Sequence, residues 1–213
     1  MATVVDLVRD RILSGAVEAG RPIRQDALAA ELGVSKIPLR EALARLEQEG
    51  LVRAEANRGF FVRALSASEA EEVYALRLKI EPDATAAAAL SASEADREAA
   101  QAALGALERA IETQAADVGA LNRAFHLALV RPAGRAVTSN IVAHLHVLSE
   151  RYVRVHLAPS GRNERATQEH RELIAAWLAR RAGIVSALTR DHIERTRDDL
   201  RRQLENGGES VVD

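Results

Sequence analysis

Residues 28–43 read LAAELGVSKIPLREAL, a stretch in which two helical segments are separated by a short turn. The first segment, 25–32, stops at Gly33, because glycine readily adopts the left-handed conformation that ends a helix. Ser35 can cap a second helix, and Pro38 lies in its first turn, where a missing N–H costs little. The stretch therefore predicts two helices joined by a tight turn.

The residues on either side extend this pattern. Apolar side chains recur at helical spacing over 4–13 and stop at a Ser-Gly pair, which predicts one more helix before the first segment. Residues 51–53 and 60–63 resemble two short strands, with Gly59 near the turn between them. The order helix, helix, turn, helix, hairpin is that of a winged helix-turn-helix, whose third helix enters the DNA major groove.

The composition favours helices throughout. The 213 residues include no cysteine and only six aromatic side chains, whereas sheets prefer aromatic and β-branched residues. The lack of cysteine excludes disulfides, thiol nucleophiles and zinc-thiolate sites, and it agrees with a reducing cytoplasm. We therefore expect a mainly α protein in the cytoplasm.

The second part of the chain begins at Ser66 and is rich in alanine. Capping residues and apolar periodicity predict six helices there. Their expected starts and ranges are Ser68-Glu69, Ser93-Glu94, Asp117, 134–157, 162–181 and 183–206. We expect a winged helix-turn-helix domain over 1–65 and an all-α six-helix bundle over 66–213.

Charge and hydropathy exclude some classes of protein. A formal net charge of −2 argues against wrapping nucleic acid with the whole surface, but it allows a small DNA-binding domain. The longest uncharged stretch, 136–149, is shorter than the roughly 18 apolar residues of a membrane span. Asp6 and Arg9 interrupt the first apolar run, so we expect no signal peptide and no membrane partner.

The segment 28–43 closely resembles the DNA-binding domain of GntR-family bacterial transcription regulators. The similarity continues through the end of the third helix and the wing, at Arg45-Leu46, Glu49-Gly50-Leu51-Val52 and Asn57-Arg58-Gly59-Phe60-Phe61-Val62. The resemblance implies binding to double-stranded DNA. It places Ser35, Lys36, Ile37 and Arg40 at DNA-contacting positions and Gly59 at the wing tip.

The chemistry of these residues suits that role. Ser35, Lys36 and Arg40 offer donors to phosphates and base edges, and the N–H groups of the first turn add an anion site. The family often has Arg-Thr where this chain has Lys36-Ile37, which favours a methyl contact from Ile37 over bidentate guanine recognition by Lys36. Arg58 is a candidate phosphate contact. Helix pattern alone leaves open a plain structural module with solvated surface charges.

Four residues of the second part form a candidate metal site. Asn122 and His126 are four apart and share a helix face. His170 and His192 each lie on a separate predicted helix of the bundle. Three neutral imidazoles and one oxygen would bind Zn²⁺ or Ni²⁺ with coordination positions left open. Spacing alone equally allows ordinary buried or surface histidines.

This part is similar to the FCD effector-binding domain of FadR-type GntR regulators, and six helices resemble its VanR subgroup. The similarity implies a divalent metal held by Asn122, His126, His170 and His192. Many relatives have a carboxylate where this chain has Asn122. The neutral amide lowers the expected metal affinity and leaves a dipositive site able to bind a carboxylate effector directly.

Arg77 and Glu81 match the first helix of the FCD domain, and two roles for Arg77 stay open. Its guanidinium can hold the carboxylate of an effector, or it can pair with Glu81 one helical turn away. We expect His144, His146 and His156 to take no part in metal binding.

Together these features predict a homodimeric, ligand-responsive repressor of a catabolic or transport operon that binds a palindromic operator. One alternative is a regulator for which the metal itself is the signal. Another is a metalloenzyme in which the ion activates water. The enzyme is disfavoured because the chain lacks a His-Glu-x-x-His arrangement, and Glu169 is expected to point away from the face of His170.

Overall fold

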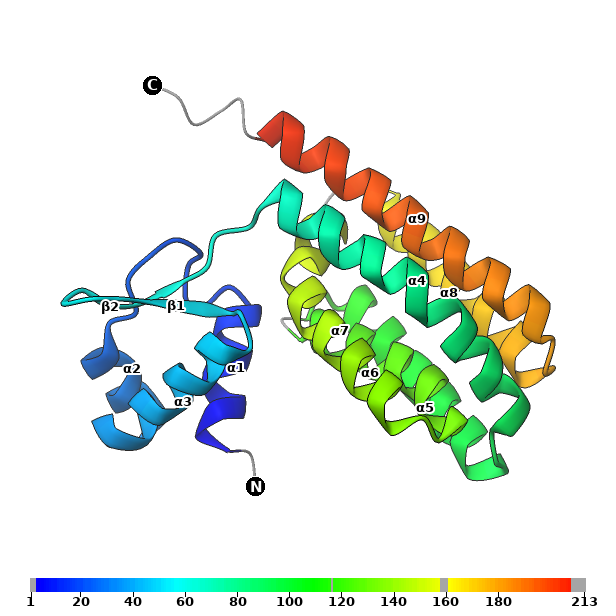
Figure 1. The fold of residues 1–213 in the computed structure, drawn as a ribbon, viewed down its shortest axis with the longest axis horizontal. Helices are drawn as coiled ribbons and strands as arrows, with labels where there is room; N and C mark the ends of the chain where they lie inside the picture. Colours follow the sequence, from blue (N-terminus) through cyan, green and yellow to red (C-terminus); the bar gives the residue numbers. More distant parts are fainter. Residues whose placement is uncertain (1–2, 116, 158–160, 208–213) are drawn as a thin grey trace. The chain divides into compact units, whose positions relative to one another are not determined.

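The computed structural model describes residues 3–115, 117–157 and 161–207 (Figure 1). The chain divides into two compact units, Met1–Leu65 and Ser66–Asp213. The first is small and carries a two-stranded sheet, and the second is entirely helical in its described part. None of the described helices is long and apolar enough to cross a membrane.

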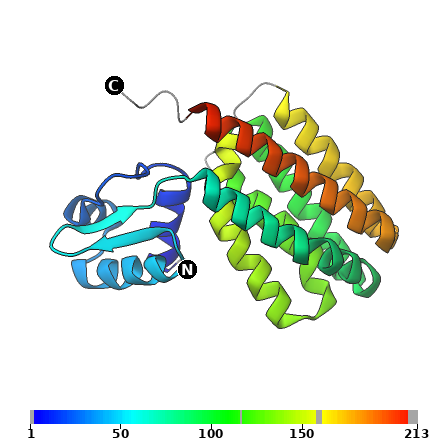
Figure 2. The same ribbon diagram turned by 45° about the horizontal axis from the view of Figure 1, so that its top comes forward.

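The first unit is a three-helix core with a hairpin (Figure 2). Its elements are α1 (Val4–Leu13), α2 (Gln25–Leu32), α3 (Lys36–Gln48), β1 (Val52–Glu55) and β2 (Gly59–Val62). Gly33 ends α2 with φ of 65°, as expected from the sequence. Leu39, Leu43 and Leu46 form the buried face of α3. The buried face leaves the opposite side of α3 available for contacts outside the unit.

The hairpin is antiparallel, with Val52 opposite Val62 and Glu55 opposite Gly59. Gly59 has φ of 88°, a conformation that side chains with a Cβ rarely adopt. Pro22 forms an isolated bridge with Phe61, which ties the loop before α2 to the hairpin. The predicted wing is therefore present, with Gly59 at the end of its turn.

The second unit is a bundle of α-helices. Its elements are α4 (Ala67–Ser91), α5 (Glu94–Glu112), α6 (Val118–Val130), the short 3-10 helix η1 (Arg131–Ala133), α7 (Ala136–Leu157), α8 (Arg162–Leu178) and α9 (Ala182–Gly207). The long helices α4 and α9 pack side by side (Figures 1 and 2). The structure thus confirms six α-helices within the described residues of this unit.

Two details differ from the sequence-based expectation. The cap of α4 is Ser66, whose hydroxyl accepts the N–H of Glu69, so the helix begins before the Ser68-Glu69 pair. The helix η1 was not expected. It follows α6 directly and contains Pro132, which has no N–H to continue an α-helix.

The core of the bundle fixes α6 against α8. Phe125 of α6 and Leu173 and Trp177 of α8 are buried in one apolar cluster. The indole N–H of Trp177 donates to the carbonyl of Leu129 at 3.1 Å, so the burial of this polar group is compensated. This packing holds His126, the residue after Phe125, in the interior.

Candidate metal centre and DNA-binding surface

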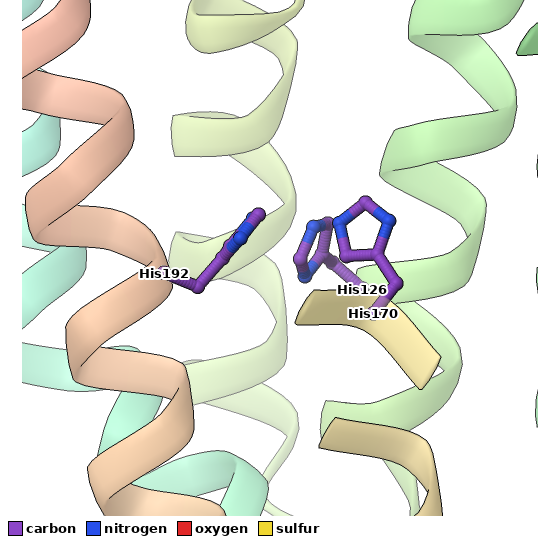
Figure 3. A group of neighbouring side chains, drawn as sticks. All are labelled: His126, His170 and His192. Carbon is purple, nitrogen blue, oxygen red and sulfur yellow. The ribbon is translucent and has the colours of Figure 1, made fainter. Parts of the chain in front are cut away.

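Three buried histidines meet in the bundle. His126 comes from α6, His170 from α8 and His192 from α9, and Figure 3 shows the His192 ring extending toward the other two. One nitrogen of each ring lies within 4.8 Å of the corresponding nitrogens of the other two. The ring centroids of His170 and His192 are 4.8 Å apart. The three side chains form a group that could hold one metal ion.

Local packing explains why these rings converge. His170, Leu173 and Trp177 recur at helical spacing on the buried face of α8. The centre of the Phe125 ring lies 5.0 Å from that of His170 and 5.3 Å from that of His126. The apolar core therefore brings the two histidines together.

The buried nitrogens of His126 and His170 lack partners. Within the described part of the chain, Nε2 of His126 and both ring nitrogens of His170 make no hydrogen bond. Leaving such an atom unsatisfied costs about 1–3 kcal/mol. Burial, followed by the charges of neighbouring histidines, lowers the pKa of both rings well below 6.5. Neutral imidazoles with unused lone pairs are what a borderline divalent metal ion requires.

His192 has a carboxylate partner outside the group of three histidines. Its Nδ1 lies 2.7 Å from Oε2 of Glu169, and Arg195 donates to the other oxygen of Glu169 at 3.0 Å. Burial opposes ionisation of Glu169, but the hydrogen bonds from His192 and Arg195 outweigh it and lower the pKa of Glu169. A carboxylate behind a ligating histidine orients the ring toward a metal. Sequence reasoning missed this contact.

The three histidines and Asn122 line one cavity of about 30 Å³, which we call the histidine chamber. Arg77 and His156 line it as well. Asn122 is half-buried on α6, one turn before His126. The structure therefore brings the four predicted metal ligands to the same chamber. Their binding of a metal stays a prediction.

Arg77 is buried in an ion pair. Its Nε lies 2.6 Å from Oε1 of Glu81, and its Nη1 donates to the hydroxyl of Ser149 at 3.3 Å. Burial raises the pKa of Glu81, but the charge of Arg77 and contact with His146 outweigh it and bring that pKa to about 2. The pairing with Glu81, one of the two roles that the sequence left open, is thus present. A contact between Arg77 and an effector stays a prediction.

His146 belongs to the same network. Its Nε2 lies 3.2 Å from Oε2 of Glu81 and 3.3 Å from Nη2 of Arg77, and its ring stacks on His126 with centroids 5.1 Å apart. Glu81, His126 and His146 could also surround an ion. Arg77 already neutralises Glu81, however, so this group is better described as a buried ion-pair network.

His144 and His156 also lie on α7. His144 is exposed, whereas His156 is buried, and its Nδ1 makes no hydrogen bond within the described residues. Oδ2 of Asp199 lies 3.9 Å from that atom. Asp199 is engaged by Arg165 and Arg202. Sequence spacing gave no sign that His156 reaches the chamber.

The start of α3 presents the predicted DNA contacts to solvent. Ser35, Lys36, Ile37 and Arg40 are exposed, and Ile37 has 72% of its surface accessible, which is unusual for a large apolar side chain. Ser35 occupies the N-cap position, but its hydroxyl makes no capping hydrogen bond. Lys36 Nζ lies 2.6 Å from Oδ1 of Asp26 in an exposed pair.

The wing places a second set of cations in reach of a ligand. Arg58 and Arg53 both pair with Glu55, and both guanidinium groups lie 5.1 Å from the centre of the Phe61 ring. A Cβ on Gly59 would lie 3.4 Å from Nε2 of Gln25, so the turn approaches the start of α2 closely. Arg53 contacts residues of the wing alone in these interactions.

Two family models match the chain. A model described as "Bacterial regulatory proteins, gntR family" matches residues 1–62, and the FCD domain matches residues 72–195. The chain belongs to the GntR family and carries an FCD domain. The family model and the relatives describe transcription regulators, not enzymes.

Individual relatives agree with this assignment. The chain is 28% identical over 88% of its length to the uncharacterized regulator BphR of Paraburkholderia xenovorans, of which the match covers 79%. It is 35% identical over 43% of its length to the uncharacterized regulator YdhC of Bacillus subtilis, and the match covers 39% of that protein. A match to the gluconate operon repressor of Bacillus licheniformis is 42% identical but covers 35% of this chain and 30% of the repressor.

Solved structures share the fold. Escherichia coli McbR/YncC aligns with a TM-score of 0.82 at 21% identity, over 95% of this chain and 99% of that one. A GntR regulator from Rhodococcus aligns with a TM-score of 0.77 at 22% identity, over 92% of this chain and 95% of that one. At these identities the likeness concerns the fold alone.

Proposed function

We propose that this chain is a cytoplasmic, homodimeric repressor that releases its DNA operator when a small organic acid binds a metal ion in the histidine chamber. The observation that supports the sensory part is the convergence of His126, His170 and His192. Buried nitrogens of His126 and His170 have no hydrogen-bond partner among the described residues. The exposed start of α3 carries the DNA-binding part.

In this proposal α3 enters the major groove of double-stranded DNA. Arg40 contacts a base edge or a phosphate, Lys36 exchanges Asp26 for a phosphate, and Ile37 contacts a thymine methyl group. Arg58, beside Gly59 in the wing, contacts the flanking backbone. Two copies related by a two-fold axis recognise the two halves of a palindromic operator.

In the chamber, His126, His170 and His192 would hold the divalent ion, Zn²⁺ or Ni²⁺, with the amide oxygen of Asn122. The ion supplies a Lewis-acidic centre for an anionic oxygen. Four neutral ligands leave its charge uncompensated, which favours a carboxylate as the next ligand. Arg77 lines the same chamber and provides a second positive charge, although Glu81 already pairs with it.

The regulated genes are inferred from relatives. The similar proteins include repressors named for gluconate and D-xylose utilisation operons. Sugar acids and related carboxylates are products of such catabolism, so a carboxylate-responsive chamber suits a repressor of a catabolic or transport operon. Acid binding in one unit and DNA binding in the other would then be coupled sites with reciprocal effects.

The function is tested with DNA duplexes that the zinc-loaded protein selects from a random pool. We expect palindromic sites, and a panel of small carboxylic acids should contain members that weaken binding by about 5- to 150-fold. His170→Ala should retain DNA binding and lose this response. An acid response that persists in His170→Ala would place the effector elsewhere.

The second candidate is a regulator for which metal itself is the signal. It is favoured by the chamber volume of about 30 Å³, which fits an ion more readily than an acid. Titration of DNA binding with Zn²⁺ or Ni²⁺ in the absence of any acid separates the two. A metal-dependent change in affinity, with no further change on addition of acids, supports metal sensing.

A further inference from the structure

The bundle contains a second cavity next to the histidine chamber. This outer cavity has a volume of about 300 Å³. Residues of α5, α6, α7 and α8 line it, among them Val118 and Asn163, together with Gln114, which follows α5. It is more open than the chamber. Neither Gln114 nor Asn163 borders the chamber, so the outer cavity has its own polar lining.

The chamber in its present state is too small for an organic acid. A water molecule needs about 10–15 Å³ of cavity volume, so a chamber of about 30 Å³ holds an ion or two waters. Even a two-carbon acid with its metal requires more space. Some side chain of the wall must therefore move when an acid enters.

Only two side chains border both cavities in the part of the bundle that the structure describes: Ile111 near the end of α5 and Leu157 at the end of α7. Both are half-buried, and both pack on the margin of the apolar core instead of inside it. Each can change rotamer with fewer lost contacts than a fully buried residue. Both side chains therefore belong to the wall that the outer cavity and the histidine chamber share.

We propose that Ile111 and Leu157 form a gate through which ligands pass from the outer cavity into the histidine chamber. The outer cavity collects a small aliphatic carboxylic acid, whose carboxylate accepts hydrogen bonds from the amides of Gln114 and Asn163. The gate then limits entry to compact acids. This inference rests on the proposed metal-and-acid site, and its test separates failure of the gate from failure of that site.

The first measurement follows zinc exchange. Stopped-flow transfer of Zn²⁺ to an excess of the chelating dye 4-(2-pyridylazo)resorcinol gives the release rate, and calorimetry gives the affinity. Ile111→Ala and Leu157→Ala should accelerate release about tenfold, because local opening becomes easier. Association should accelerate by the same factor, so the dissociation constant should stay nearly unchanged.

Matched controls separate gating from general loss of stability. The control for Ile111→Ala is Ile174→Ala, which removes the same side-chain atoms from the same apolar cluster. The control for Leu157→Ala is Leu188→Ala, which is matched in the same way. Neither Ile174 nor Leu188 borders either cavity. Both controls should exchange zinc at the wild-type rate. Equal acceleration in the controls would overturn the gate.

The second measurement needs no metal. Diethylpyrocarbonate modifies accessible imidazoles, and peptide mass spectrometry of the metal-free protein gives a rate for each histidine. His126 and His170 should react about tenfold faster in the two gate variants than in the controls, while the exposed His144 serves as the internal reference. Unchanged rates at His126 and His170 would overturn the gate. If the wild-type protein binds no zinc but His126 and His170 react faster in the two gate variants, the gate stands and the metal assignment fails.

Discussion

Nδ1 of His192 lies 2.7 Å from Oε2 of Glu169, and this contact decides which nitrogen of His192 can face His126 and His170. With Nδ1 bound to the carboxylate, Nε2 is the atom available to a metal. Glu169 is thus a positioning residue for the chamber, although no spacing in the sequence predicts its contact with His192.

Glu169→Gln should weaken zinc binding by about 10- to 100-fold, because the amide cannot support the ligating tautomer as a carboxylate does. Calorimetry with Zn²⁺ measures the change. Glu172→Gln is the matched control, since Glu172 is exposed on the same helix and contacts Gln168 instead of a histidine. Equal zinc affinity in wild type and Glu169→Gln would remove Glu169 from the site.

Asn122→Asp should tighten zinc binding and weaken acid binding. The substitution adds an anionic oxygen beside the ion while it reduces the positive charge that a carboxylate meets. Calorimetry of Zn²⁺, followed by an acid from the screen, gives both affinities. Asn140→Asp adds the same charge at an exposed position of α7 and should change neither. Tighter acid binding in Asn122→Asp would contradict a metal-bound carboxylate.

Arg40→Ala should cost about 1–3 kcal/mol of specific DNA binding and leave helical content unchanged. Arg40 is exposed and has no ion-pair partner within the described residues. Fluorescence anisotropy with a selected duplex gives the affinity. Arg45→Ala is the control on the same helix, because Arg45 pairs with Glu49, the residue that follows α3. A loss of the same size in both variants would mean that general charge, and not α3 contacts, determines affinity.

Asp26→Asn should strengthen DNA binding modestly, by up to about 1 kcal/mol, since an exposed ion pair has about that strength. The change frees Lys36 from its 2.6 Å contact and removes a negative charge close to phosphate. Glu31→Gln removes a comparable charge that pairs with Arg11 and should have a smaller effect. Weaker DNA binding by Asp26→Asn would show that Asp26 orients Lys36.

Low pH should destabilise the metal-free bundle through protonation of His156. Burial, and then the charge of His192, lowers the pKa of His156 from 6.5 to about 4. Between these two pH values the unfolded chain therefore binds more protons than the folded chain. The contribution of His156 to the free energy of unfolding is fully present above pH 6.5 and is lost as the pH falls toward 4. His156 accounts for about 2–3 kcal/mol of this loss.

Urea denaturation at pH 7, 5.5 and 4.5 measures this dependence. His156→Gln should show a smaller loss than wild type, whereas His144→Gln, an exposed position on the same helix, should match wild type. His126 and His170 contribute in the same direction, so some dependence should persist. An equal loss in wild type and His156→Gln would contradict the assignment to His156.

The features of the fold that the sequence predicts are those that depend on residues close together in the chain. The turn at Gly33 and the hairpin at Gly59 depend on backbone conformations that neighbouring residues determine, and both predictions agree with the structure. The helical period places Asn122 and His126 on one face. The convergence with His170 and His192 required the family resemblance, because helix order in a bundle follows from packing such as that of Trp177.

The features that sequence reasoning missed depend on contacts between distant elements. His146 meets Glu81 of α4, and His156 approaches Asp199 of α9. No periodicity within α7 identifies these partners. The sequence predicts that Glu169 points away from the helix face that carries His170. The contact of Glu169 with His192 comes from the neighbouring helix α9. Partners of buried polar groups are therefore the least predictable part of the site.

The central claim is that three histidines from α6, α8 and α9 bind one metal ion. Crystals grown with Zn²⁺ and measured at the zinc absorption edge test it directly. We predict one anomalous peak per chain, bonded at about 2.0–2.1 Å to a nitrogen from each of His126, His170 and His192. A structure in which these imidazoles bind no ion at equimolar or excess zinc, or in which zinc binds only elsewhere, would contradict the account.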